Sequence, residues 1–153
     1  MIIRFIWTNV EQGGSLVYRK ESLIKRIEQL RQYSYDLKEM QGISFEQYIK
    51  DKKVKYSTER LLFLIAENIL DFLDHLLSSR FEIISDSYEQ IIENAYKKAL
   101  IDDNLYSKLK GLGSFRNVLA HEYLNLSDEE VFRNLKKMLT VIDDVIYHFD
   151  RSV

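Results

Sequence analysis

The sequence of 153 residues contains no cysteine, no proline and only five glycines. Without cysteine there can be no disulfide framework, no thiolate metal site and no cysteine nucleophile. Proline and glycine favour tight turns, so their scarcity argues against a turn-rich β-fold and favours a few long helices. The length is enough for one domain with a core of its own and too short for two ordinary domains.

An excess of charge and long apolar runs are also missing. The net charge of −2 excludes a globally basic nucleic-acid binder, so any contact with RNA would have to be local. No apolar run approaches membrane-spanning length. The apolar start Met1–Trp7 contains Arg4 and is followed by no small-residue cleavage site, which argues against a signal peptide. Together with the absence of cysteine, these features predict a cytoplasmic protein.

Residues 1–18 differ from the rest of the chain. Gly13, Gly14 and Ser15 form the one flexible cluster in the sequence and separate the apolar start from the first periodic segment. Three interpretations stay open: a short strand, an arm that packs on a neighbour, or a translated upstream region that is not native. We therefore divide the chain into an N-terminal extension, 1–18, and a helical domain, 19–153.

Helical periodicity dominates from Glu21 onward and predicts an all-α fold, an up-and-down bundle of four long helices plus one or two short ones. The first stripe should end before Gly42. The central helix should be apolar over a wide face and reach Ser79. The residues expected to cap the later helices are Ser44 with Gln47, Ser57 or Thr58, Ser85–Ser87, Asp102 or Asp103, and Ser127 with Glu130.

The segment from Arg116 to Tyr123 concentrates unlike polar groups in eight residues. If it is helical throughout, Arg116 and Tyr123 share one stripe, and Asn117 and His121 share the adjacent stripe. The two stripes would form a polar face, with Phe115, Val118 and Leu119 as its buried backing. We expect this segment to belong to the helix that begins after Asp102 or Asp103.

Such a face has the groups needed to cleave RNA without a metal. The fork of Arg116 matches phosphate oxygens, and His121 can take and return a proton near neutral pH. One histidine cannot easily serve as base and acid on opposite sides of one phosphate, whereas two copies across a two-fold axis can. The chemistry therefore predicts a homodimer with the motif at its interface. A lone helical Arg-x4-His also occurs by chance, so spacing alone leaves a structural role equally open.

The string from Phe115 to Tyr123 resembles the Arg-x4-His-x-Tyr signature of the HEPN superfamily, and specifically of its HepT branch. The resemblance extends over roughly residues 20–150, with Glu59-Arg60 and the pair Asp71 and His75 as further matching features. It does not cover residues 1–18.

The resemblance implies an endoribonuclease toxin of a two-gene toxin–antitoxin system. Arg116 and His121 would be the catalytic pair, and Asn117 would orient or bind the phosphate. Tyr123 would receive AMP from a partner antitoxin, a minimal nucleotidyltransferase of the MntA type, and the added bulk and charge would silence the site. No cofactor is implied. The alternatives are a non-catalytic nucleotide- or substrate-binding companion of a nucleotidyltransferase, and a purely structural dimer.

Other charged residues are secondary candidates. Lys108 and Lys110 could extend a phosphate track to the motif, joined by Arg133, Lys136 and Lys137, or could belong to a solvated face. Glu59-Arg60 could be an inward ion pair or a surface pair. We expect His75 to make a hydrogen bond on a helix surface, assign no role to His148, and expect no metal site.

Overall fold

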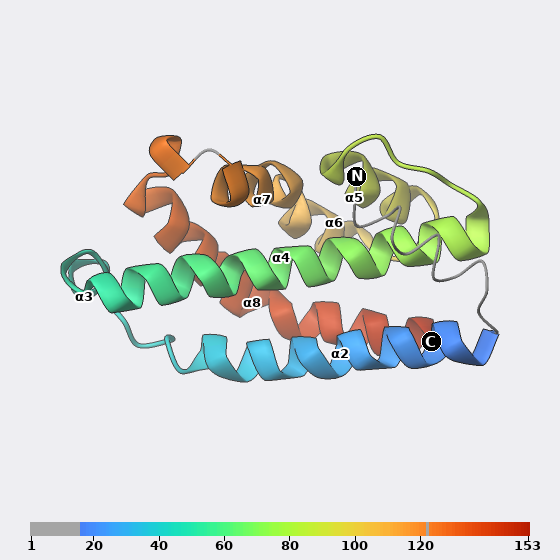
Figure 1. Ribbon diagram of the computed structural model, residues 1–153, viewed down its shortest axis with the longest axis horizontal. Helices are drawn as coiled ribbons and strands as arrows, with labels where there is room; N and C mark the ends of the chain where they lie inside the picture. The colour runs from blue at the N-terminus through green and yellow to red at the C-terminus, as the bar shows by residue number, and fades with distance from the viewer. Residues whose placement is uncertain (1–15, 122) are drawn as a thin grey trace.

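A computed structural model describes residues 16–121 and 123–153, the side chains of residues 16–19 and 123 excepted. Throughout these residues the secondary structure is helical, with no strand, which confirms the predicted all-α bundle (Figure 1). The elements are α2 (Leu16–Lys38), α3 (Phe45–Lys50), α4 (Lys52–Phe81), α5 (Tyr88–Lys97), α6 (Asp103–Leu109), α7 (Leu112–His121), the 3-10 turn η1 (Tyr123–Asn125) and α8 (Asp128–Ser152).

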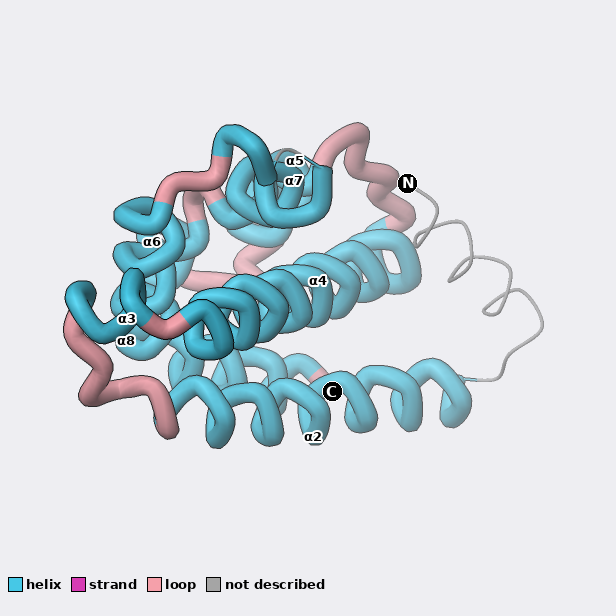
Figure 2. Tube along the Cα trace, turned by 60° about the vertical axis from the view of Figure 1, so that its left-hand side comes forward, coloured by secondary structure: helices cyan, strands magenta, loops and turns pink. Residues whose placement is uncertain are grey.

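Helix α4 is the centre of the bundle. It packs against α2 and α8 on one side and against α5 and α7 on the other (Figures 1 and 2). Its 30 residues bury a wide face that includes Leu62, Ile69 and Leu76, as the apolar pattern predicts. The Phe72 ring stacks on Phe149 of α8 with centroids 3.8 Å apart, which joins the two longest helices.

Helix α2 buries the predicted stripe: Leu23, Ile27, Leu30, Ser34 and Leu37. The helix begins at Leu16, inside the segment that the sequence assigns to an extension. Residues 1–15 lie outside the described part of the chain. No helix among the described residues is long and apolar enough to cross a membrane.

Helix α4 begins earlier than its sequence suggests. Asp51, not Ser57 or Thr58, is the N-cap, and its carboxylate accepts hydrogen bonds from the backbone N–H groups of Lys53 and Val54. Thr58 is buried inside the helix and donates its hydroxyl to the carbonyl of Val54. The other expected caps, Ser44, Ser87, Asp102 and Ser127, are confirmed.

The expected helix around the motif is two helices, because the chain turns at Gly111. This residue has φ +90°, a conformation that L side chains rarely adopt. The Glu89 carboxylate of α5 accepts hydrogen bonds from the N–H groups of Gly111, at 3.0 Å, and of Gly113, at 2.9 Å. A negative charge at the first turn of α7 also suits the helix dipole. The start of α7 is therefore fixed by α5.

Gly113 allows α7 to approach the backbone of α5. A Cβ at this position would lie 2.5 Å from the backbone nitrogen of Glu89 and 2.8 Å from the carbonyl carbon of Tyr88. Backbone cannot move aside as a flexible side chain can, so the two helices would have to separate.

We predict that Gly113→Ala lowers the free energy of unfolding by about 1–3 kcal/mol, because the added methyl group displaces α7 from α5. Urea unfolding followed by circular dichroism measures the loss. Gly42→Ala is the matched control, since a Cβ there meets nothing within 4 Å. Equal midpoints for the two variants would contradict the close approach.

Candidate active site

Helix α7 divides the predicted motif between its inner and outer faces. Arg116 is 8% exposed and points into the bundle. Asn117 and His121 are exposed and lie one turn apart on the outer face. The prediction that Arg116 and His121 share one polar face is therefore wrong, because Arg116 is buried and His121 lies at the surface.

Four side chains contact the guanidinium of Arg116, two through hydrogen bonds and two through their aromatic rings. Its Nε donates to the carboxylate of Glu67 on α4, and its Nη1 donates to Oδ1 of Asn117 at 3.3 Å. The central carbon lies 4.4 Å from the ring centroid of Tyr88 and 5.3 Å from that of Phe63. These distances are within the range of cation–π attraction. Side chains from α4, α5 and α7 therefore determine where this cation lies.

A row of carboxylates along α4 continues from Glu67. Asp71 and Asp74 follow at spacings of four and three residues, and Arg26 of α2 interacts electrostatically with Glu67 and Asp71. Burial raises the pKa of Asp71 from 3.8 to about 7. Arg26 and Arg116 lower this pKa, whereas Glu67 and Asp74 raise it further. The row places negative charge behind the arginine of the motif.

This pKa predicts how stability depends on pH. The folded pKa of Asp71 lies above the unfolded value, so the folded state holds the proton more tightly, and stability falls as pH rises from about 4 to about 7. Asp71→Asn removes this loss. We expect the variant to gain on the order of 2 kcal/mol relative to the wild type between pH 4.5 and pH 8, measured by urea unfolding at both values. Asp36→Asn, at an exposed position of α2, is the control. If the free energy of unfolding changed equally with pH in the wild type and in Asp71→Asn, the raised pKa of Asp71 would be contradicted.

Helix α7 ends at His121, before the last residue of the motif. Tyr123 opens the 3-10 turn η1, so it does not share a helical stripe with Arg116 as expected. The side chain of Tyr123 lies outside the described part of the structure. Its neighbour Leu124 is 92% exposed, which makes η1 a protruding turn beside the end of α7.

The apolar backing of the motif is partly confirmed. Phe115 is buried in the core, while Val118 and Leu119 are only half-buried. Leu119 still packs against the core, so α7 is anchored mainly through its first half.

The expected basic residues contact different parts of the fold. Lys110 lies over the ring of Tyr106, and Nζ of Lys137 donates to the carbonyl of Lys110 at 3.5 Å, near the start of α7. Lys136 instead donates to the carbonyls of Gln41 and Ile43, in the turn between α2 and α3. Lys108 is half-buried and Arg133 is exposed. A role of Lys108 and Lys110 in RNA contact stays a prediction.

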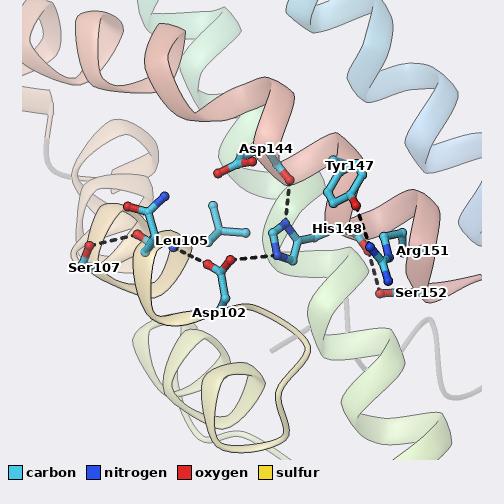
Figure 3. A network of polar contacts seen from close by, with 9 residues as sticks. Asp102, Leu105, Ser107, Asp144, Tyr147, His148, Arg151 and Ser152 are labelled. Carbon is cyan, nitrogen blue, oxygen red and sulfur yellow. Dashed lines mark hydrogen bonds and ion pairs between the residues drawn. The ribbon is translucent and has the colours of Figure 1, made fainter.

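The two histidines outside the motif are held within the fold. His75 is 4% exposed, which overturns the expected surface position, because its face of α4 points into the bundle. His148 of α8 joins two helices (Figure 3). Its Nδ1 lies 2.9 Å from the carbonyl oxygen of Asp144, and its Nε2 lies 3.3 Å from the carboxylate of Asp102, the cap of α6.

Neither interpretation of Glu59-Arg60 holds. No ion pair joins these two described residues; instead, the exposed Arg60 lies 5.5 Å from the ring centroid of Phe63. Glu59 interacts electrostatically with Lys55 and Asp128. Within the described residues no group of three or more histidines, aspartates or glutamates is arranged to hold a metal ion.

The residues that surround Arg116 were missed by the sequence interpretation. Glu67, Phe63 and Tyr88 lie 28 to 53 positions before it, and no local spacing links them to the motif. One signal was present: Glu67, Asp71 and Asp74 recur at helical spacing in the largely apolar middle of a long helix. A charged stripe on a central helix requires partners, and Arg26 and Arg116 are among them.

Comparison with solved structures gives the same fold in several proteins. YutE from Bacillus subtilis, described as a cytosolic protein of unknown function, has a TM-score of 0.74 at 17% identity, over 86% of this chain and 88% of YutE. A tri-AMPylated HEPN toxin from Shewanella oneidensis, solved in complex with its MNT antitoxin, has a TM-score of 0.73 at 19% identity, over 84% of this chain and 96% of the toxin.

Comparison of sequences identifies the family as well as the fold. A tRNA nuclease HepT from Aphanizomenon flos-aquae is 32% identical over 108 residues, which are 70% of this chain and 73% of the relative. The model of the ribonuclease HepT-like family matches residues 23–149, which include α7 and the whole Arg-x4-His-x-Tyr motif. The chain therefore belongs to the HepT-like ribonuclease family.

Proposed function

We propose that the protein is a metal-independent endoribonuclease toxin of a toxin–antitoxin system, with Arg116 and His121 as its catalytic pair. The observation that carries the proposal is that α7 holds an Arg116 guanidinium bonded to Glu67 and, five residues later at the end of the same helix, an exposed imidazole of His121. Family membership and the tRNA nuclease relative support the reaction class. The reaction would take place in the cytoplasm.

The chemistry requires no group beyond the side chains of the motif. Arg116 stabilises the negative charge that develops on the phosphate, and Asn117 orients the guanidinium through the bond to Nη1. The 2′-oxygen attacks the phosphorus as a base removes its proton, and the bond from phosphorus to the 5′-oxygen breaks as an acid protonates that oxygen. The products are a 2′,3′-cyclic phosphate and a free 5′-hydroxyl.

Two proton-transfer groups are required, and the chain has three histidines. His75 is buried, and His148 bridges α6 and α8. Only His121 is exposed on α7, so the second imidazole would come from His121 of another copy. The proposed active form is therefore a homodimer with α7 at a shared cleft.

The proposed off-switch is attachment of AMP to Tyr123 by a nucleotidyltransferase antitoxin. Tyr123 follows His121 by two residues and opens the turn η1 at the end of α7. A nucleotide there would bring bulk and negative charge to the place where the RNA backbone must lie. The AMPylated toxin of similar fold, bound to its MNT antitoxin, supports a partner of this kind.

We predict that His121→Ala lowers RNA cleavage in EDTA by at least roughly 100-fold, because proton transfer at the reacting oxygens is lost. His148→Ala is the matched control: it loses the contacts to Asp102 and Asp144 and is less stable, but below its melting temperature it still cleaves RNA. Cleavage of labelled tRNA on denaturing gels measures both variants.

Mixed dimers test the shared cleft. With equal amounts of wild-type and His121→Ala chains, random pairing leaves about a quarter of the dimers fully wild type, and we expect activity to fall with that fraction. Activity proportional to the wild-type chain concentration would contradict a shared site. Wild-type activity of His121→Ala would remove the proposed role of His121. If the wild-type protein itself leaves RNA uncut, that result would favour the alternative, a non-catalytic nucleotide- or substrate-binding companion of the nucleotidyltransferase.

We predict that Tyr123→Phe abolishes AMP attachment by the partner nucleotidyltransferase and leaves RNA cleavage intact, since only the phenolic oxygen is removed. Mass spectrometry after incubation with ATP and the partner measures the added AMP. Tyr56→Phe, at an exposed tyrosine on α4, is the control and should be modified like the wild type. An AMP adduct on the Tyr123→Phe protein would assign modification to another residue.

A further inference from the structure

Glu67 is the group that holds the arginine of the motif, although it lies 49 residues away in the sequence. Its carboxylate accepts from Nε of Arg116, and both side chains are largely buried, with 15% and 10% of their surfaces exposed. Charge-assisted hydrogen bonds of this kind are strong and directional. The contact therefore fixes the orientation of the guanidinium, as well as neutralising it.

The geometry points to a positioning role rather than to stability alone. A buried ion pair contributes little net stability, because desolvation of both charges offsets their attraction. What it does supply is a fixed arrangement. Nε donates to Glu67 and Nη1 donates to Asn117, and the rings of Tyr88 and Phe63 lie within cation–π distance of the guanidinium. On the proposed mechanism, a phosphate oxygen would bind guanidinium nitrogens that Glu67 does not engage.

We propose that Glu67 is a positioning residue for RNA cleavage: it holds the Arg116 guanidinium in the orientation that stabilises the reacting phosphate. This inference rests on the proposed catalytic role of Arg116. Glu67 does not touch RNA and takes no part in proton transfer. It acts by keeping a long and otherwise flexible side chain in one rotamer before the substrate binds.

The backbone around the arginine supports the same role. Tyr88, which covers one face of the guanidinium, is followed directly by Glu89, which binds the first turn of α7. The start of α5 thus positions both the helix and its arginine. Glu67 adds the contact from α4, so the cation is held by two elements besides its own helix.

Glu67→Gln and Glu67→Ala test the proposal, with Glu93→Gln, at an exposed position on α5, as the matched control. We expect the two Glu67 variants to lower kcat about 10–100-fold with less than about threefold change in KM, because the lost contact acts in the transition state. Glu93→Gln should cleave RNA like the wild type. Melting curves identify any variant that fails to fold.

A second experiment tests the proposal even if Glu67→Ala is unstable: a small guanidinium compound is used to restore cleavage by a variant that lacks Arg116. Ethylguanidinium added to Arg116→Ala should restore part of the cleavage when Glu67 is present, and none in Arg116→Ala with Glu67→Gln. A role of Glu67 in folding alone would not produce this difference, because both proteins lack the arginine and both would be compared in the folded state.

Several results would overturn the proposal. Folded Glu67 variants that cleave RNA at the wild-type rate would show that the orientation of Arg116 does not depend on Glu67. Faster cleavage would show that the ion pair withholds the arginine from RNA. Rescue that is independent of Glu67 would remove the positioning role. If Arg116→Ala itself cleaves like the wild type, the proposed function fails and this inference fails with it.

Discussion

The candidate site depends on the close contact between the start of α7 and the start of α5. Glu89 accepts hydrogen bonds from the N–H groups of Gly111 and Gly113, and the missing side chain of Gly113 lets the two backbones meet. The N–H groups that open a helix have no partner within it, so a carboxylate from a neighbouring helix that accepts from two N–H groups at this point also positions the helix. One turn further along α7, Arg116 meets Tyr88, the residue before Glu89. The place of the cation therefore follows from where α7 begins.

Burying Arg116 beside a row of carboxylates costs free energy, because charged groups lose their contact with water. Arg116 is matched by Glu67, and Arg26 lies near Glu67 and Asp71, so positive and negative groups alternate between α2, α4 and α7. The balance is incomplete, because burial raises the pKa of Asp71 to about 7. Near neutral pH Asp71 is therefore partly protonated. The burial of Asp71 therefore costs stability near neutral pH, where its carboxyl group loses its proton.

The sequence patterns correctly predicted the features that depend on interactions between residues close together in the chain. The stripe on α2, the central position of α4 and four caps depend on residues within one or two turns of one another, and the structure confirms them. The same logic failed at Gly111, where a left-handed residue ends α6 and lets α7 start anew. It also failed to see that Arg116 points inward. The orientation of the Arg116 side chain depends on its contacts. Two of these, with Glu67 and Tyr88, form only when α4 and α5 pack against α7. The family resemblance identified the motif, but not the side chains that hold it.

The buried Arg116 and the exposed His121 differ in the partners that their proposed roles require. The Arg116 guanidinium bonds to Glu67 and Asn117 and lies near the rings of Tyr88 and Phe63 within the folded chain. His121 stands at the exposed end of α7 and, on the proposed mechanism, needs a second imidazole that this chain does not offer. One folded chain would thus hold a prepared phosphate-binding cation and half of the proton-transfer machinery. Control would then act most effectively at the end of α7, where the second copy must approach and where Tyr123 opens the next turn. On the proposed mechanism, a modification there would leave the core and the arginine intact and would block the assembled site.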